Sequence, residues 1–101
     1  MILGKVVGTV WATRKDEQMV GMKIQIVREV DLDYNPKDRF VIAVDSVGAG
    51  VGEIVLVAQG SSARQTELTH NKPIDAVITA IVDKLDVSFQ GDPELTHTED
   101  Q

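Results

Sequence analysis

A single run, residues 41–64 (VIAVDSVGAGVGEIVLVAQGSSAR), limits the folds open to this chain of 101 residues more than any other feature. Two strand-like apolar segments flank a loop that carries Gly48, Gly50 and Gly52. Phosphate-binding glycine loops need a helix directly behind them, because the free N–H groups and the dipole of its first turn hold the anion. Here a strand pattern follows instead. We therefore interpret the glycines as positions where the backbone passes close to another surface or adopts a positive φ.

Composition and charge exclude several classes of protein. The length predicts one domain, and the absence of cysteine excludes disulfides and thiolate metal sites. The net charge of −6 is concentrated in residues 91–101, which hold four of the 16 acidic residues and none of the ten basic ones. The remaining body is close to neutral, so it has no electrostatic reason to bind nucleic acid or an anionic membrane. We see no membrane-spanning run and no secretory signal, and we expect a cytosolic protein.

Most of the chain predicts β-strands. Residues 2–12 form a strand pattern with Gly4 and Gly8 at positions where a small barrel can bend. Residues 22–30 alternate Met22, Ile24 and Ile26 with polar residues, as in a half-buried strand that pairs with the first. Residues 31–39 predict a turn or surface loop. Strands over residues 40–45 and 53–58 then flank the glycine loop.

The C-terminal half is harder to interpret. Ser61 or Ser62 can cap a short helix that runs to about Leu68. Apolar residues in segment 74–87 have helical spacing, and periodicity alone favours a helix. Their β-branched side chains also suit a strand buried on both faces, so the pattern does not decide between the two. We expect residues 1–90 to form the domain and residues 91–101 an extended acidic tail.

No residue pattern predicts catalysis, a cofactor or a metal site. His70 and His97 are interpreted as solvated surface residues. Asp45 and Glu53 bracket the glycine loop, and a structural role is preferable to a catalytic pair. We expect Asp45 to accept hydrogen bonds from the N–H groups of the loop, and Glu53 to pair with a base such as Arg64 or with a neighbouring subunit.

Four segments together resemble the EutN/CcmL family of bacterial microcompartment vertex proteins. They are residues 1–13 (MILGKVVGTVWAT), residues 22–27 (MKIQIV), the run 41–64 and residues 73–83 (PIDAVITAIVD). The resemblance covers about residues 1–87, in order, and the glycine-loop block is its most specific part. The acidic tail is not part of it.

The resemblance implies an all-β fold with a short helix, a small five-stranded OB-like barrel in which segment 74–87 is largely a strand. It also implies a structural, non-enzymatic protein in the bacterial cytoplasm, a cyclic homopentamer that caps the five-fold vertices of a microcompartment shell. Its partners would be copies of itself and hexameric shell proteins, with no nucleic acid and no membrane. The type of microcompartment, carboxysome or catabolic, is left open.

In a head-to-tail ring, space is scarcest where five copies converge on the axis. Small and flexible residues suit that position. We therefore predict a subunit interface and pore lining formed by Ser46, Val47, Gly48, Ala49, Gly50, Val51, Gly52, Glu53 and Arg64.

Two other functions compete with this one. An OB-like barrel can bind single-stranded nucleic acid, although it then needs a basic groove and exposed aromatic residues, and both are scarce here. A small enzyme or nucleotide binder would use the glycine loop with Asp45 and Glu53, but the missing helix and the lack of a nucleophile weaken that reading.

Overall fold

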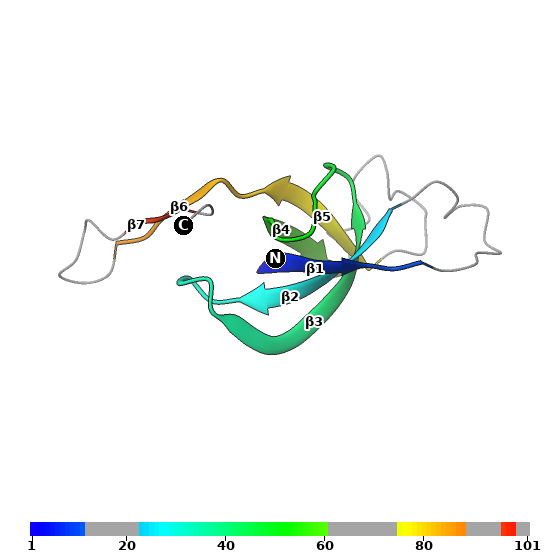
Figure 1. The fold of residues 1–101 in the computed structure, drawn as a ribbon, viewed down its shortest axis with the longest axis horizontal. Helices are drawn as coiled ribbons and strands as arrows, with labels where there is room; N and C mark the ends of the chain where they lie inside the picture. The colour runs from blue at the N-terminus through cyan, green and yellow to red at the C-terminus, as the bar shows by residue number, and fades with distance from the viewer. Residues whose placement is uncertain (12–22, 61–74, 89–95, 99–101) are drawn as a thin grey trace.

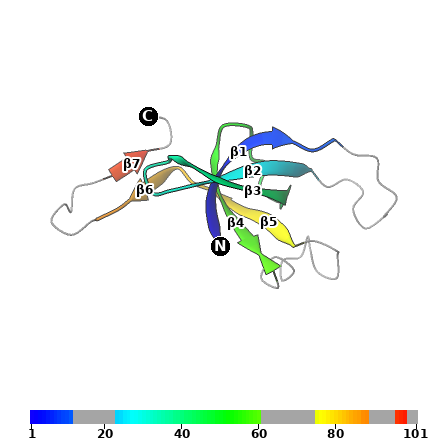
Figure 2. The same ribbon diagram turned by 90° about the horizontal axis from the view of Figure 1, so that it is seen from below.

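The computed structural model describes residues 1–11, 23–60, 75–88 and the backbone of residues 96–98. Five strands close into a barrel in the order β1-β2-β3-β5-β4, and β4 pairs again with β1 (Figures 1 and 2). Only β3 and β5 run parallel; the other neighbours are antiparallel. This confirms the predicted all-β, OB-like barrel. The strands are β1 (Ile2–Thr9), β2 (Ile24–Val30), β3 (Pro36–Asp45), β4 (Ile54–Gln59) and β5 (Ala76–Ile81).

The barrel interior is filled by small and β-branched side chains from all five strands. Because alternate residues of a strand point to opposite faces, each strand contributes only one or two of them. Ala49, from the glycine loop, joins this cluster and closes it at one end. The cluster contains Ile2, Val6, Val27, Val41, Ala43, Ala49, Val55, Val57, Ala76 and Ile78.

Glycine is needed at the two positions in β1 for different physical reasons. A Cβ on Gly4 would lie 2.4 Å from Cγ1 of Val27 and 3.0 Å from the carbonyl oxygen of Arg28, so β1 and β2 approach too closely there for any side chain. Gly8 follows a break in register, since Val6 pairs with Val27 but Gly8 already pairs with Ile26. The predicted bend in β1 is therefore a β-bulge between Val6 and Gly8.

The inward face of β2 is not the one that the alternation suggests. Gln25 and Val27 are buried inside the barrel, while Ile24 and Ile26 lie outside it and are only partly buried. Ile24 packs there against a second, smaller core cluster of Val44, Ala58 and Val77. The predicted inward face is wrong for the barrel interior, which holds the hydrogen-bonded amide of Gln25, although Ile24 still packs against the second cluster. Met22 lies outside the described residues.

Two further strand boundaries differ from expectation. The predicted loop over residues 31–39 is wrong in its second half, because β3 begins at Pro36 and only residues 31–35 form the turn. The charged residues of this strand end are tolerated because they remain exposed, and Lys37 and Arg39 form ion pairs with Glu29. The predicted helix after Gly60 falls in residues 61–74, which lie outside the described residues.

The described part of segment 74–87 is largely strand and contains no helix, as the resemblance implies, so the preference for a helix from periodicity is wrong. It forms β5 and then β6 (Lys84–Asp86), which leaves the barrel and pairs with β7 (Thr96–Thr98) (Figure 1). A short strand therefore lies within the segment that was expected to be an extended tail. No α-helix occurs in the described parts of the chain.

Candidate functional site in the glycine loop

The glycine loop, residues 46–53, connects β3 to β4. Gly48 and Gly52 have φ values of +77° and +98°, and no atom lies within 4 Å of a Cβ placed on either. Both positions therefore require glycine for backbone conformation and not for space inside the chain. Gly50 has no positive φ, and its Cβ position lies 3.4 Å from Oε1 of Glu53.

Asp45 fixes the start of the loop. Its Oδ1 accepts hydrogen bonds from the backbone N–H groups of Val47, at 3.0 Å, and Gly48, at 2.9 Å. The predicted role of Asp45 is thus confirmed. The hydroxyl of Ser46 donates to the carbonyl oxygen of Ile78 at 2.5 Å and ties the same end of the loop to β5.

Glu53 and β1 fix the end of the loop. Oε1 of Glu53 accepts from the N–H of Gly50 at 2.6 Å, and the N–H of Glu53 donates to the carbonyl of Gly50 at 3.1 Å. The backbone of Val6 forms hydrogen bonds with this turn on both sides. Its carbonyl oxygen accepts from the N–H of Gly52, and its N–H donates to the carbonyl oxygen of Glu53. The carboxylate of Glu53 thus has a partner within its own loop. The expected contact between Glu53 and Arg64 stays a prediction, because Arg64 lies outside the described residues.

Gln25 is a supporting residue that the sequence reading missed. Its side chain is fully buried inside the barrel, where Nε2 donates to the carbonyl of Ala49 at 2.8 Å and to Oδ2 of Asp45 at 3.3 Å. Its Oε1 accepts from the hydroxyl of Thr9 at 2.8 Å. The amide thereby links β1, β2 and the glycine loop. The sequence signal for this role was a polar residue two positions before the buried Val27, and therefore on the same face of the strand.

The loop presents some of its residues to solvent and keeps others inside. Ala49 is 0% exposed and packs in the core. Gly50 and Glu53 are half-buried. The exposed residues are Ser46, Val47, Gly48, Val51 and Gly52.

The described residues contain neither a metal-binding cluster nor a membrane-spanning helix. No cluster of three or more histidine or acidic side chains that could hold a metal ion occurs among them. None of their segments is a helix long and apolar enough to cross a membrane.

Comparison with known proteins identifies relatives of this barrel. The sequence profile of the family described as "Ethanolamine utilisation protein EutN/carboxysome" matches residues 1–83. The carboxysome shell vertex protein CcmL of Synechocystis sp. is 41% identical over 87% of this chain and 88% of its own length. The bacterial microcompartment shell vertex protein PduN of Salmonella typhimurium is 44% identical over 84% of this chain and 98% of its own length.

Solved structures agree with the sequence match. The structure of Gloeobacter violaceus CcmL superposes with a TM-score of 0.81, at 39% identity, over 86% of this chain and 90% of that one. The pentameric microcompartment shell protein GrpN of Rhodospirillum rubrum superposes with a TM-score of 0.79, at 44% identity, over 87% of this chain and 100% of that one. The chain therefore belongs to the EutN/CcmL family, whose members include the shell vertex proteins of carboxysomes and other bacterial microcompartments.

Proposed function

We propose that this chain is a structural subunit of a bacterial microcompartment shell, located in the cytoplasm, where five copies form a ring that caps the five-fold vertices. The observation that carries the proposal is the superposition of its barrel on the full length of the pentameric GrpN chain. A closed ring of five needs two different contact surfaces on each subunit and a fixed angle between them. A barrel without free edges in its wall is a rigid body that can hold such an angle.

The exposed part of the glycine loop suits the crowded centre of the ring. Ser46, Gly48 and Gly52 present little side chain, and Val47 and Val51 offer apolar contact. Hydrogen bonds that the carboxylates of Asp45 and Glu53 accept from loop N–H groups, and one that Gln25 donates to Ala49, hold this surface in one conformation before assembly. Ala49 supports the loop from inside, and we place Arg64 in the same interface.

The ring has no enzymatic role in this proposal. Its partners are copies of itself and hexameric shell proteins, which form the flat facets around each vertex. A hexagonal layer cannot close into a polyhedron without five-fold positions, so the ring is the component that permits closure.

The function is tested by shell assembly. Purified hexameric shell protein from the same host is mixed with this chain and examined by electron microscopy, with the hexamers alone as the control. We expect closed polyhedral particles only when this chain is present, with density for it at the vertices. Particles that close equally well without the chain, or that exclude it, would contradict the proposal.

A further inference from the structure

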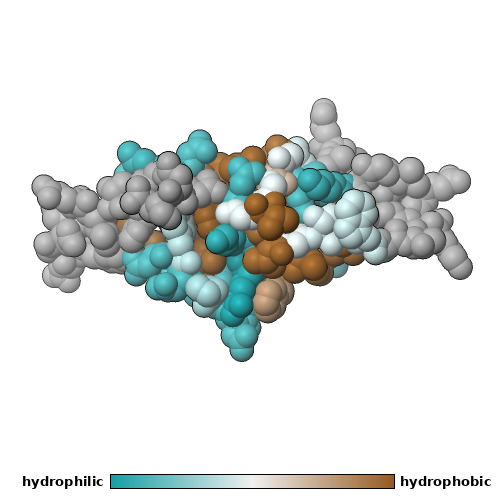
Figure 3. All heavy atoms as spheres, in the orientation of Figure 1, coloured by the Kyte–Doolittle hydropathy of each residue, from teal (hydrophilic) through white to brown (hydrophobic). Residues whose placement is uncertain are grey.

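The outer face of the β1-β2-β3 wall carries large apolar side chains in one continuous group. Ile26 lies directly opposite Gly8 on one side and Ile42 on the other, so three strands form a single row. Ile42 is 55% exposed, and the neighbouring Phe40 and Val7 are 53% and 43% exposed. Figure 3 shows hydrophobic side chains gathered in the middle of the face that carries β1 and β2. Monomeric proteins rarely leave such a group in contact with water.

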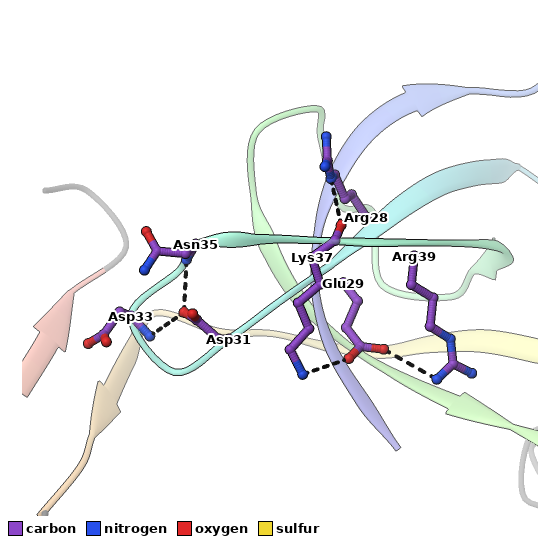
Figure 4. A network of polar contacts seen from close by, with 7 residues as sticks. All are labelled: Arg28, Glu29, Asp31, Asp33, Asn35, Lys37 and Arg39. Carbon is purple, nitrogen blue, oxygen red and sulfur yellow. Dashed lines mark hydrogen bonds and ion pairs between the residues drawn. The ribbon is translucent and has the colours of Figure 1, made fainter.

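A basic row borders this apolar group. Lys5 and Arg28 are direct cross-strand partners, and Arg28 lies opposite Phe40, with its guanidinium carbon 5.1 Å from the ring centroid. Figure 4 shows Arg28 pointing away from the side of the hairpin that holds Glu29. Neither Lys5 nor Arg28 forms an ion pair with a described residue. Two like charges directly opposite on adjacent strands are unfavourable in an isolated chain.

A hollow of about 270 Å³ adjoins the basic row. It offers apolar walls with the two positive charges beside them, which suits an apolar side chain followed by a carboxylate. The hollow is lined by Lys5, Val7, Arg28, Val30, Tyr34 and Pro36.

The other side of the same chain has the complementary charge. β4 and β5 pair with each other and neither touches β2, so they form the wall across the barrel from it. Described residues 46–60 and 75–88, which contain β4, β5 and the segments next to them, hold four acidic side chains and one basic one, Lys84. Described residues 1–11 and 23–30 contain three basic side chains and one acidic one, Glu29. Residues 31–45, which form the turn and β3, add four acidic and two basic side chains, so the charge contrast lies between β1-β2 and the segments around β4 and β5.

We propose that the outer face of β1-β2-β3 is the surface on which the next copy of this chain docks, with Phe40 and Ile42 at its centre. Lys5 and Arg28 receive carboxylates from the acidic segments that adjoin β4 and β5 of that copy. The inference rests on the proposed function, because a head-to-tail ring needs two complementary and non-identical surfaces on each subunit. It adds the identity of one of these surfaces, which lies on the barrel wall and apart from the glycine loop.

Substitution of one outward side chain tests the assignment. Ile42→Glu places a charge in the apolar group without changing the barrel interior, and Leu32→Glu is the matched control, since Leu32 is 47% exposed in the turn beyond β2. Native mass spectrometry should find five chains for the wild type and for Leu32→Glu, and single folded chains for Ile42→Glu. A pentameric Ile42→Glu would overturn the assignment. A wild type that is not pentameric would instead overturn the proposed function.

A labelling experiment keeps the test valid if Ile42→Glu fails to fold. The chain has no cysteine, so Ile42→Cys and Leu32→Cys each introduce a single thiol. In the pentamer, we expect a maleimide to label Ile42→Cys about tenfold or more slowly than Leu32→Cys, because the centre of an interface excludes water. Equal rates would overturn the assignment. Salt-dependent binding of a labelled oligonucleotide that protects Ile42→Cys would overturn it in favour of nucleic acid on this face.

Discussion

The side-chain amide of Gln25 donates a hydrogen bond to the carbonyl oxygen of Ala49 at 2.8 Å, and so connects the middle of the barrel to its glycine loop. Both residues are fully buried. The loop is consequently part of the folded core on its inner side, although Val47 and Val51 on its outer side are exposed. A loop held in this way can present a fixed surface to a neighbouring subunit.

Replacing Gln25 by leucine should destabilise the chain by about 1–3 kcal/mol. Leucine fills a similar volume but leaves the hydroxyl of Thr9 and the carbonyl of Ala49 without this partner inside the barrel. Urea unfolding at a fixed protein concentration measures the loss. Thr9→Val, which removes only one of these hydrogen bonds, should cost less. A Gln25→Leu chain as stable as the wild type would show that the amide does not support the loop.

Gly4 and Gly8 offer a matched pair in β1. Gly4→Ala should cost about 1–3 kcal/mol, because its Cβ would lie 2.4 Å from Cγ1 of Val27 and must displace the core or the strand. Gly8→Ala should be nearly neutral, since its nearest contact, Cδ1 of Ile26, is an ordinary 3.5 Å away. Thermal unfolding of both variants gives the comparison. Equal losses would show that strand flexibility, and not close approach, determines these positions.

Within the loop, Gly52→Ala should destabilise folding more than Gly50→Ala. Gly52 has a φ of +98°, which costs an alanine about 1–2 kcal/mol or more, whereas Gly50 has no positive φ. The nearest neighbour of a Cβ on Gly50 is the carboxylate of Glu53, at 3.4 Å, which must give only slightly. Denaturant midpoints of the two variants test the order. The reverse order would contradict the conformational role assigned to Gly52.

A bulky residue at Gly50 should affect assembly more than folding. Gly50→Leu leaves the barrel interior unchanged but adds volume to the loop surface proposed to lie near the ring axis. Circular dichroism should retain the wild-type strand signal, while native mass spectrometry should show loss of the pentamer. If folding and assembly are lost together, Gly50 serves only the turn of its own chain.

Asp31 is expected to titrate below the ordinary aspartate value of 3.8. The backbone N–H of Asn35, chiefly, and that of Asp33 donate to its carboxylate at 2.9 and 2.8 Å, which lowers its pKa (Figure 4). A lowered pKa in the folded state means that the turn is stabilised above pH 3.8 and loses this contribution as the pH falls through the folded-state pKa. NMR titration of the folded chain, with the urea-unfolded chain as reference, measures the difference. A folded-state midpoint at or above the unfolded one would contradict it.

The fold could be predicted from the sequence where a single physical requirement determined the local structure. Asp45 follows a strand and precedes a glycine-rich loop, so its role as an acceptor for loop N–H groups could be predicted and is confirmed. The strand over residues 76–81 could not be derived from spacing, because the spacing of its apolar residues favours a helix, although β-branched residues such as Ile78 and Ile81 also suit a strand. For this segment, the resemblance to the family predicted the strand correctly.

The prediction from sequence was wrong where tertiary packing overrode the local hydrophobic pattern of a strand. Hydropathy places Ile24 and Ile26 on the inward face of β2, yet the barrel interior holds Gln25, whose amide bonds to the carbonyl of Ala49, and only Ile24 packs against a second cluster outside it. The outward Ile26 then becomes part of the exposed row with Ile42. An apolar residue on the wrong face of a strand is thus the feature that points to a partner, and it becomes visible only once the register is known.

The number of chains in the native particle tests the whole interpretation most directly. Native mass spectrometry of the wild-type protein at micromolar concentration should show one dominant species that contains five copies. A stable monomer, or a closed ring with another number of subunits, would contradict a vertex role for this chain.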